Sequence, residues 1–265
     1  MNLQWWCSAQ AIPWDWSWRP YPGVWLFVLA AAGLYWLVAF RDDGTGGRRG
    51  WAIAGFLTLW IALDWPIGAL GGGYLSSVHM LQYLLIALVA PALLLLGVPD
   101  SAWTRLADSR ARPVLRLLTH PLIALGVFQV VLIWTHLPAT VDGLMASQWG
   151  SFLIDILWLF GGLIFWWPVI SPVPDRPWFG EPLKMGYLFL ATVLNTMPYA
   201  FLTFGESPYY GIYELAPPVG RLTAGEDQQI AGLLMKVGGG VILWTAITTI
   251  WFRWYSREEA ECPAP

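Results

Sequence analysis

Residues 74–97 read YLSSVHMLQYLLIALVAPALLLLG, an apolar run with a few polar side chains near its start. About 20 helical residues, at a rise of about 1.5 Å each, cross the hydrocarbon core of a bilayer, so this run predicts a transmembrane helix. Six further runs of similar character lie at residues 23–40, 51–70, 121–140, 149–170, 183–205 and 228–252. We therefore expect an all-α integral membrane bundle of seven transmembrane helices.

The composition agrees with a membrane protein and excludes other classes. Hydrophobic residues make up 57% of the 265 residues, and charged residues make up 12%. So few charges do not cover the surface of a soluble globule, and so many apolar side chains exclude a disordered chain. The formal net charge of −3 gives no basic surface. We therefore expect a lipid bilayer around the protein and no nucleic-acid partner.

The distribution of positive charge predicts the orientation. The loops after the first, third, fifth and seventh runs carry eleven of the 14 Lys and Arg residues, whereas the N-terminal segment and the other loops carry two. Positive loops stay cytoplasmic, so we expect the N-terminus outside and the C-terminus in the cytoplasm of a bacterium, with the protein in the inner membrane. This divides the chain into an outer interfacial segment rich in Trp and Pro at 1–22, a membrane domain at 23–252 and a cytoplasmic tail at 253–265.

Several polar side chains fall in the outer half of the predicted helices, where burial in lipid is costly. Imidazole and thioether groups suit Cu(I), so the pattern predicts a metal site formed by His79, Met80, His136, Met235 and Asp227. The alternative is structural, because a membrane His often makes an interhelical hydrogen bond and Met often fills a core. No catalytic triad or P-loop stands out and no predicted helix carries two His, so we expect neither an enzyme nor a haem protein.

Four segments, in order along the chain, resemble one membrane family. They are the string from His79 to Pro99, WTHLP at 134–138, GLIFWWPV at 162–169 and DQQIAGLLM at 227–235. They are similar to segments of the CtaG-like cytochrome c oxidase assembly factors, a seven-helix family. The resemblance implies an assembly factor for a haem-copper oxidase that assists copper delivery at the periplasmic face. The partners it implies are oxidase subunits or another membrane complex.

Three positions depart from the pattern of that family. Tyr83 stands where the resemblance expects a second His, Ile154–Asp155 replaces an acidic–His pair, and Lys236 replaces an aromatic residue. These departures leave fewer imidazoles for copper. A second hypothesis is therefore a structural module of the same fold, bound stably to a respiratory or photosynthetic complex, with copper binding lost. A transporter that uses the membrane Asp and Lys is a third, but the paired repeats typical of many transporters are not evident.

The last expectation concerns an interaction between Asp155 and Lys236. They lie at similar depth below the outer surface, about 9 Å and about 12 Å at the helical rise. An unpaired charge at this depth costs about 3 kcal/mol on insertion scales. We therefore expect an Asp155–Lys236 ion pair that bridges the fifth and seventh predicted helices.

Overall fold

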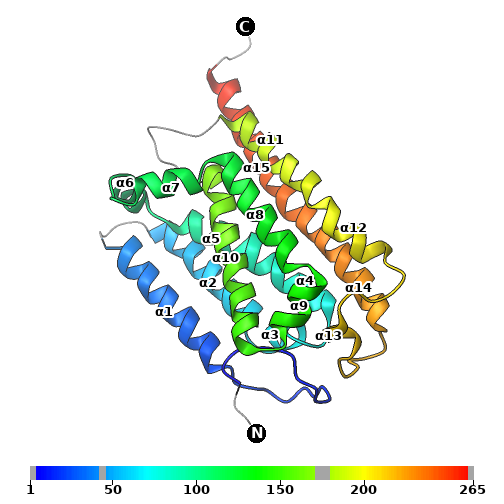
Figure 1. Ribbon diagram of the computed structural model, residues 1–265. Coiled ribbons are helices and arrows are strands. Elements are labelled where there is room, and N and C mark those ends of the chain that lie inside the picture. Colours follow the sequence, from blue (N-terminus) through cyan, green and yellow to red (C-terminus); the bar gives the residue numbers. More distant parts are fainter. Residues whose placement is uncertain (1–3, 42–45, 171–179, 262–265) are drawn as a thin grey trace.

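The computed structural model describes residues 4–41, 46–170 and 180–261, and all regular structure in these ranges is helical. The long helices run roughly along one axis (Figure 1). In chain order the elements are α1 (Pro22–Ala39), α2 (Gly46–Leu63), α3 (Ile67–Gly71), α4 (Ser76–Tyr83), the π-helix η1 (Leu84–Val89), α5 (Ala90–Gly97), α6 (Asp100–Ala107), α7 (Arg112–Leu118), α8 (Pro121–Thr135), α9 (Pro138–Met145), α10 (Gln148–Ile170), α11 (Glu181–Leu194), α12 (Thr196–Phe204), α13 (Gly211–Glu214), α14 (Ala224–Leu233), the π-helix η2 (Leu234–Gly238) and α15 (Gly239–Glu261).

Five helical segments of the described chain are long and apolar enough to cross a membrane, namely Pro22–Ala39, Ser76–Gly97, Gln148–Ile170, Glu181–Phe204 and Ala224–Ala260. α7 and α8 pass the same test together, but they are bent by 67° and give a sixth span only if the pair is taken as one. The helical membrane bundle is therefore confirmed, whereas the count of seven is not. The expected span at 51–70 corresponds to α2, which starts with the sequence GGRRG and ends at Leu63 before the short helix α3.

Several expected spans are broken inside the bundle. The runs at 74–97 and 228–252 each contain a π-helical stretch between two α-helices. The run at 183–205 is divided at Asn195 into α11 and α12. The run at 121–140 ends early, because Pro138 cannot continue α8 and instead begins α9. Breaks and π-helical turns are frequent at functional sites, so they mark where to look for one.

The span α4–η1–α5 is the centre of the bundle. Of its most apolar window, 67% is buried, against 17% for α1 at the edge. α10 packs against this span through glycine, since a Cβ added to Gly162 would lie 2.1 Å from the carbonyl oxygen of Ala87. α2 packs along α5 with Ala52 against Gly97. Such contacts between small residues let membrane helices approach closely and fix how α4 faces its neighbours.

Residues 4–21 form no helix and lie across one end of the bundle, here called the cap end (Figure 1). The side chain of Gln148, at the start of α10, accepts the backbone N–H of Trp5 at 2.7 Å. The hydroxyl of Tyr74, just before α4, donates to the carbonyl of Ile12 at 2.9 Å. α15 runs to the opposite end, where residues 253–261 of the expected tail continue the helix. Residues 262–265 of that tail lie outside the described residues.

Candidate functional site

Two histidines meet inside the bundle near the cap end. His79 lies in the first turn of α4, and His136 follows directly after the last residue of α8. Their ring centroids are 6.4 Å apart. His79 is 2% exposed and His136 is 7% exposed. The two imidazoles that the sequence placed at similar depth on different helices are therefore close neighbours.

Aromatic rings enclose the two imidazoles. Trp158 of α10 lies against both, with centroids 4.8 Å from His79 and 5.9 Å from His136. Tyr83, one turn after His79 on α4, meets the His136 ring edge-on at 5.1 Å. Tyr213 of α13 has its ring centroid 5.9 Å from that of His79. These five residues form what we call the histidine cluster.

Several polar atoms of the histidine cluster are buried without a hydrogen-bond partner. His136 Nδ1 lies 2.7 Å from the carbonyl oxygen of Leu132. A carbonyl only accepts, so Nδ1 carries the proton and Nε2 keeps a lone pair, for which the described residues provide no partner. Both ring nitrogens of His79 and the hydroxyl of Tyr83 also have no hydrogen-bond partner among the described residues. Buried polar atoms are normally satisfied, so this group of atoms points to a ligand.

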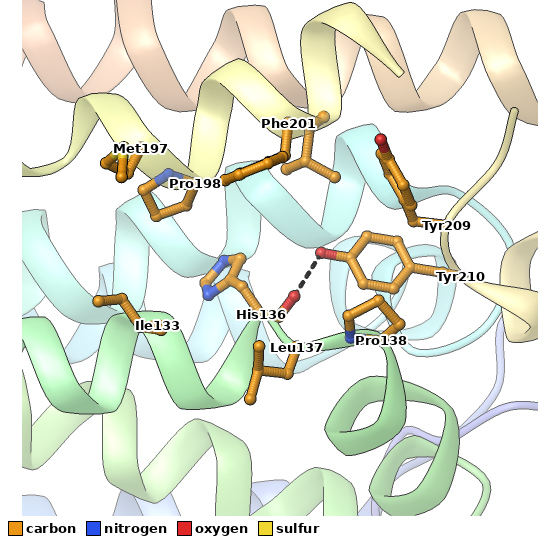
Figure 2. A pocket seen from close by; sticks show the side chains of 10 residues that line it. Ile133, His136, Leu137, Pro138, Met197, Pro198, Phe201, Tyr209 and Tyr210 are labelled. Atoms are coloured by element: carbon orange, nitrogen blue, oxygen red, sulfur yellow. Dashed lines mark hydrogen bonds between the residues drawn. The ribbon is translucent and has the colours of Figure 1, made fainter. Parts of the chain in front are cut away.

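Hydrogen bonds around the histidine cluster hold its rings in position. Trp158 Nε1 donates to the hydroxyl of Thr135 at 2.9 Å. The hydroxyl of Tyr213 donates to a backbone carbonyl of α3 at 2.7 Å, and burial raises the pKa of Tyr213 well above its ordinary value, so the hydroxyl keeps its proton. Tyr210 donates to the backbone carbonyl of His136 at 2.9 Å (Figure 2). The rings are therefore held in place, while both ring nitrogens of His79 and Nε2 of His136 have no hydrogen-bond partner among the described residues.

Asp227, which the sequence analysis included among the metal ligands, anchors the start of α4 instead. Its carboxylate accepts the backbone N–H of Ser76 at 2.6 Å and the Ser76 hydroxyl at 2.7 Å. The Ser77 hydroxyl donates to the other carboxylate oxygen. A helix N-terminus has unsatisfied N–H groups and a partial positive charge, and this carboxylate complements both. Both oxygens accept hydrogen bonds here, and through them Asp227 joins α14 to α4.

The two methionines of the expected set are buried. Met80 directly follows His79 and is 0% exposed. Met235 is 4% exposed and lies on η2, which packs against α4. Both remain predicted thioether ligands. No group of three or more His, Cys, Asp or Glu side chains in the described ranges could hold a metal ion, so the predicted site depends on the two imidazoles and the thioethers.

The structure corrects the expected ion pair between Asp155 and Lys236, because each side chain has other partners. Asp155 accepts the indole N–H of Trp6 at 2.8 Å and the side-chain amide of Gln82 at 3.3 Å. Lys236 Nζ reaches α12, where it lies 3.3 Å from the hydroxyl of Thr196 and over an aromatic ring. The N-terminal segment thus supplies a neutral donor to the membrane carboxylate, which the sequence spacing did not indicate.

A pocket of about 350 Å³ adjoins the histidine cluster between α8 and α12 (Figure 2). Side chains of the α8–α9 turn, of α12 and of the loop after α12 line it, among them His136, Leu137, Pro138, Met197, Phe201 and Tyr209. The lining is mostly apolar, and no acidic residue of the described chain belongs to it. We call it the side pocket. Of the five members of the histidine cluster, His136 also lines the side pocket.

Comparison with known families bears on the whole membrane domain. A family model described as cytochrome c oxidase caa3 assembly factor matches residues 31–257. The chain belongs to this family. The resemblance drawn from four short segments is therefore confirmed, and the match extends beyond them to include half of α1 and most of α15.

Relatives of this chain include uncharacterized proteins of Mycobacterium bovis (strain ATCC BAA-935 / AF2122/97) and Mycobacterium tuberculosis (strain CDC 1551 / Oshkosh), each 25% identical over 194 residues. The match covers 63% of this chain and 29% of each relative, so the chain spans less than a third of their length. No solved structure matches.

The sequence analysis missed two rings of the histidine cluster. Trp158 carried a usable signal, because it lies three residues after Asp155 and so shares its side of a helix. Tyr213 lies in a short helix between two expected spans, and no pattern marked it. Tyr83 was noted as a replaced His, and the structure places its ring against His136. Its unpartnered hydroxyl makes it a polar member of the site.

Proposed function

We propose that this assembly factor binds copper at the histidine cluster and assists copper delivery to a haem-copper cytochrome c oxidase. The observation that carries the proposal is the buried pair His79 and His136, whose free nitrogens lie in a rigid aromatic frame. Membership of the assembly-factor family supports an oxidase as the partner and a non-catalytic role. Copper is cargo in this proposal, so the protein must hold it and release it.

The spacing of the two imidazoles is compatible with one ion between them. An imidazole nitrogen binds a metal at about 2.0 Å, and the ring centre lies about 1.1 Å behind that nitrogen, so two rings on one ion have centres up to about 6 Å apart. The observed separation of the centroids is 6.4 Å. A small shift of either ring is enough to bring both nitrogens onto the same ion.

The donor set favours Cu(I) over a hard cation. Imidazole and thioether are soft or borderline ligands, whereas Mg²⁺ and Ca²⁺ require oxygen ligands. Asp227 is engaged at the start of α4, so its carboxylate does not add oxygen ligands. The bond from His136 Nδ1 to the Leu132 carbonyl fixes the ring and its tautomer, as such bonds do for metal-bound histidines. The aromatic frame limits the access of water to the ion.

We infer further that the chain crosses the bacterial inner membrane seven times, with the cap end facing the periplasm. The count is supported by α2, which packs along α5 and η1 inside the bundle. The orientation is supported by the excess of Lys and Arg in alternate loops, because positive loops stay cytoplasmic. In this orientation the histidine cluster lies in the outer half of the membrane, on the side where copper delivery is expected.

A structural module bound stably to an oxidase or another membrane complex is the second candidate. The small ligand set favours it, since the described residues provide no group of three His, Cys, Asp or Glu side chains suited to a metal. Copper binding ranks first, because a purely structural role gives no reason for unpartnered nitrogens on both imidazoles. A structural role is normally fulfilled by a hydrogen bond between the two helices.

Anaerobic titration of the purified protein with Cu(I) tests the proposal. We expect one tightly held ion per wild-type chain, and much weaker binding with less copper retained in His79→Ala or His136→Ala when both variants elute as folded protein. His120→Ala is the matched control, because His120 precedes α8 at the end opposite to His136. Equal copper content in wild type and His79→Ala, or no copper in wild type, would leave the structural module.

A further inference from the structure

The histidine cluster is closed toward the cap end. Trp6 is fully buried, and its indole N–H donates to Asp155, which ties the N-terminal segment to α10. Tyr213 lies against His79 and donates to a carbonyl of α3. His79 itself is 2% exposed. An ion that approaches along the bundle axis from the cap end therefore meets a tightly packed surface.

The side pocket offers a different approach to the same cluster. It lies beside the turn where α8 ends and beside α12, and Tyr209 and Tyr210 of the following loop line it as well (Figure 2). His136 is part of its wall. His136 is thus reached from the side of the bundle, through residues of the α8–α9 turn and of α12.

The chemistry of the side pocket selects what can enter it. Its described lining has no carboxylate, and this disfavours a hard divalent cation. Met197 of α12 contributes a thioether to the lining and is 66% exposed. A thioether at the accessible side and an imidazole at the buried side are successive ligands for a soft cation.

We propose that the side pocket is the entrance through which Cu(I) reaches the histidine cluster, and that Met197 is the first ligand of the incoming ion. This inference rests on the proposed function. The sulfur of Met197 displaces one ligand of the copper donor, and Nε2 of His136 then replaces a second. Copper keeps its charge of +1 throughout. Thioether and neutral imidazole bind through lone pairs, so no proton is released and no oxidant is needed.

The rate of copper transfer into the purified protein tests the entrance. The probe is the coloured Cu(I) complex of bicinchoninate, mixed anaerobically with the full chain in detergent micelles while the loss of colour is followed. We expect Met197→Leu to load about tenfold more slowly than wild type, the lower end of what the loss of an outer-shell partner costs a metal site, and to reach the same final copper content. Met197→Cys keeps a sulfur ligand and should retain most of the rate.

Met185→Leu is the matched control, because Met185 lies on α11, twelve residues before Met197 and about 18 Å away at the helical rise. It should load like wild type. Equal rates for Met197→Leu and wild type would overturn the entrance and leave the proposed function standing. The same slowing in Met185→Leu would also overturn it. A wild-type protein that takes up no copper would instead contradict the proposed function itself.

Discussion

Polar side chains around the start of α4 are of two kinds: some are hydrogen-bonded, and others have no hydrogen-bond partner among the described residues. The carboxylate of Asp227 accepts hydrogen bonds from the backbone and hydroxyl of Ser76 and from Ser77. The imidazole of His79, three residues beyond Ser76, has no hydrogen-bond partner among the described residues. The first arrangement stabilises the fold, and the second leaves lone pairs for a ligand. Removing the carboxylate of Asp227 should therefore lower stability, whereas removing the imidazole of His79 should lower copper binding.

Asp227→Asn should destabilise the protein without removing copper. The amide keeps one acceptor oxygen and turns an NH₂ group toward donors of α4, and hydrogen bonds to a charged group contribute about 1.5–3 kcal/mol. Thermal unfolding in detergent measures the loss, and a Cu(I) titration of the folded variant measures the copper content. A variant as stable as wild type that no longer binds copper would make Asp227 a ligand after all.

Single residues were predictable as unusual, but their partners were not. His79 and His136 stood out because they interrupt apolar runs. The bond between Trp6 and Asp155 joins residues 149 positions apart, and it places a neutral indole where spacing suggested a lysine. Depth along a helix can be estimated from the rise per residue, whereas the direction in which a side chain points depends on how the helices are rotated against one another.

At the level of whole elements, the close contact between α10 and the span α4–η1–α5 depends on Gly162. A Cβ on Gly162 would meet the carbonyl oxygen of Ala87 at 2.1 Å and the ring of Pro91 at 2.7 Å. The neighbouring Gly161 has its nearest atom, on Val131, at 3.5 Å, which is an ordinary contact. Of these two adjacent glycines, Gly161 has room for a Cβ and Gly162 does not.

Gly162→Ala should weaken the bundle, and Gly161→Ala should not. Overpacking a close helix contact costs about 1–3 kcal/mol, whereas Ala at an unhindered helical position is favoured over Gly by up to about 1 kcal/mol. Thermal unfolding of the two variants, side by side in the same detergent, checks the difference. Equal midpoints would mean that α10 is not packed against η1 through Gly162.

The elements themselves were only partly predictable. Apolar runs located the long helices, because the length of a run reflects the thickness of the membrane. The division at Asn195 and the π-helices η1 and η2 were not anticipated, since a π-helical turn depends on packing rather than on local sequence. The early end of α8 was signalled by Pro138 but not recognised as the start of α9.

At the scale of the whole molecule, the described chain begins and ends at opposite ends of the bundle (Figure 1). Labelling from outside the cell tests the orientation, but Cys7 is unsuitable as a reporter. It is buried, and burial raises the pKa of its thiol well above the ordinary value. Cys262, the other cysteine of the chain, lies outside the described residues.

New cysteines at exposed positions avoid this difficulty. In a background without Cys7 and Cys262, Ala11→Cys should react with a membrane-impermeant maleimide on cells whose outer face is accessible. Ala260→Cys should react only after the inner membrane is permeabilised. Both positions are exposed in the structure. The reverse pattern would turn the cap end, and the histidine cluster with it, toward the cytoplasm.

Copper binding by His79 and His136 together is the central claim, and X-ray absorption at the copper edge of the Cu(I)-loaded protein tests it most directly. The spectrum of the wild type should contain the multiple-scattering pattern of imidazole ligands with nitrogen neighbours at about 2.0 Å. That pattern should weaken in His136→Ala and stay unchanged in His120→Ala. A spectrum that contains only sulfur and oxygen neighbours, or that is identical in all three proteins, would contradict the account.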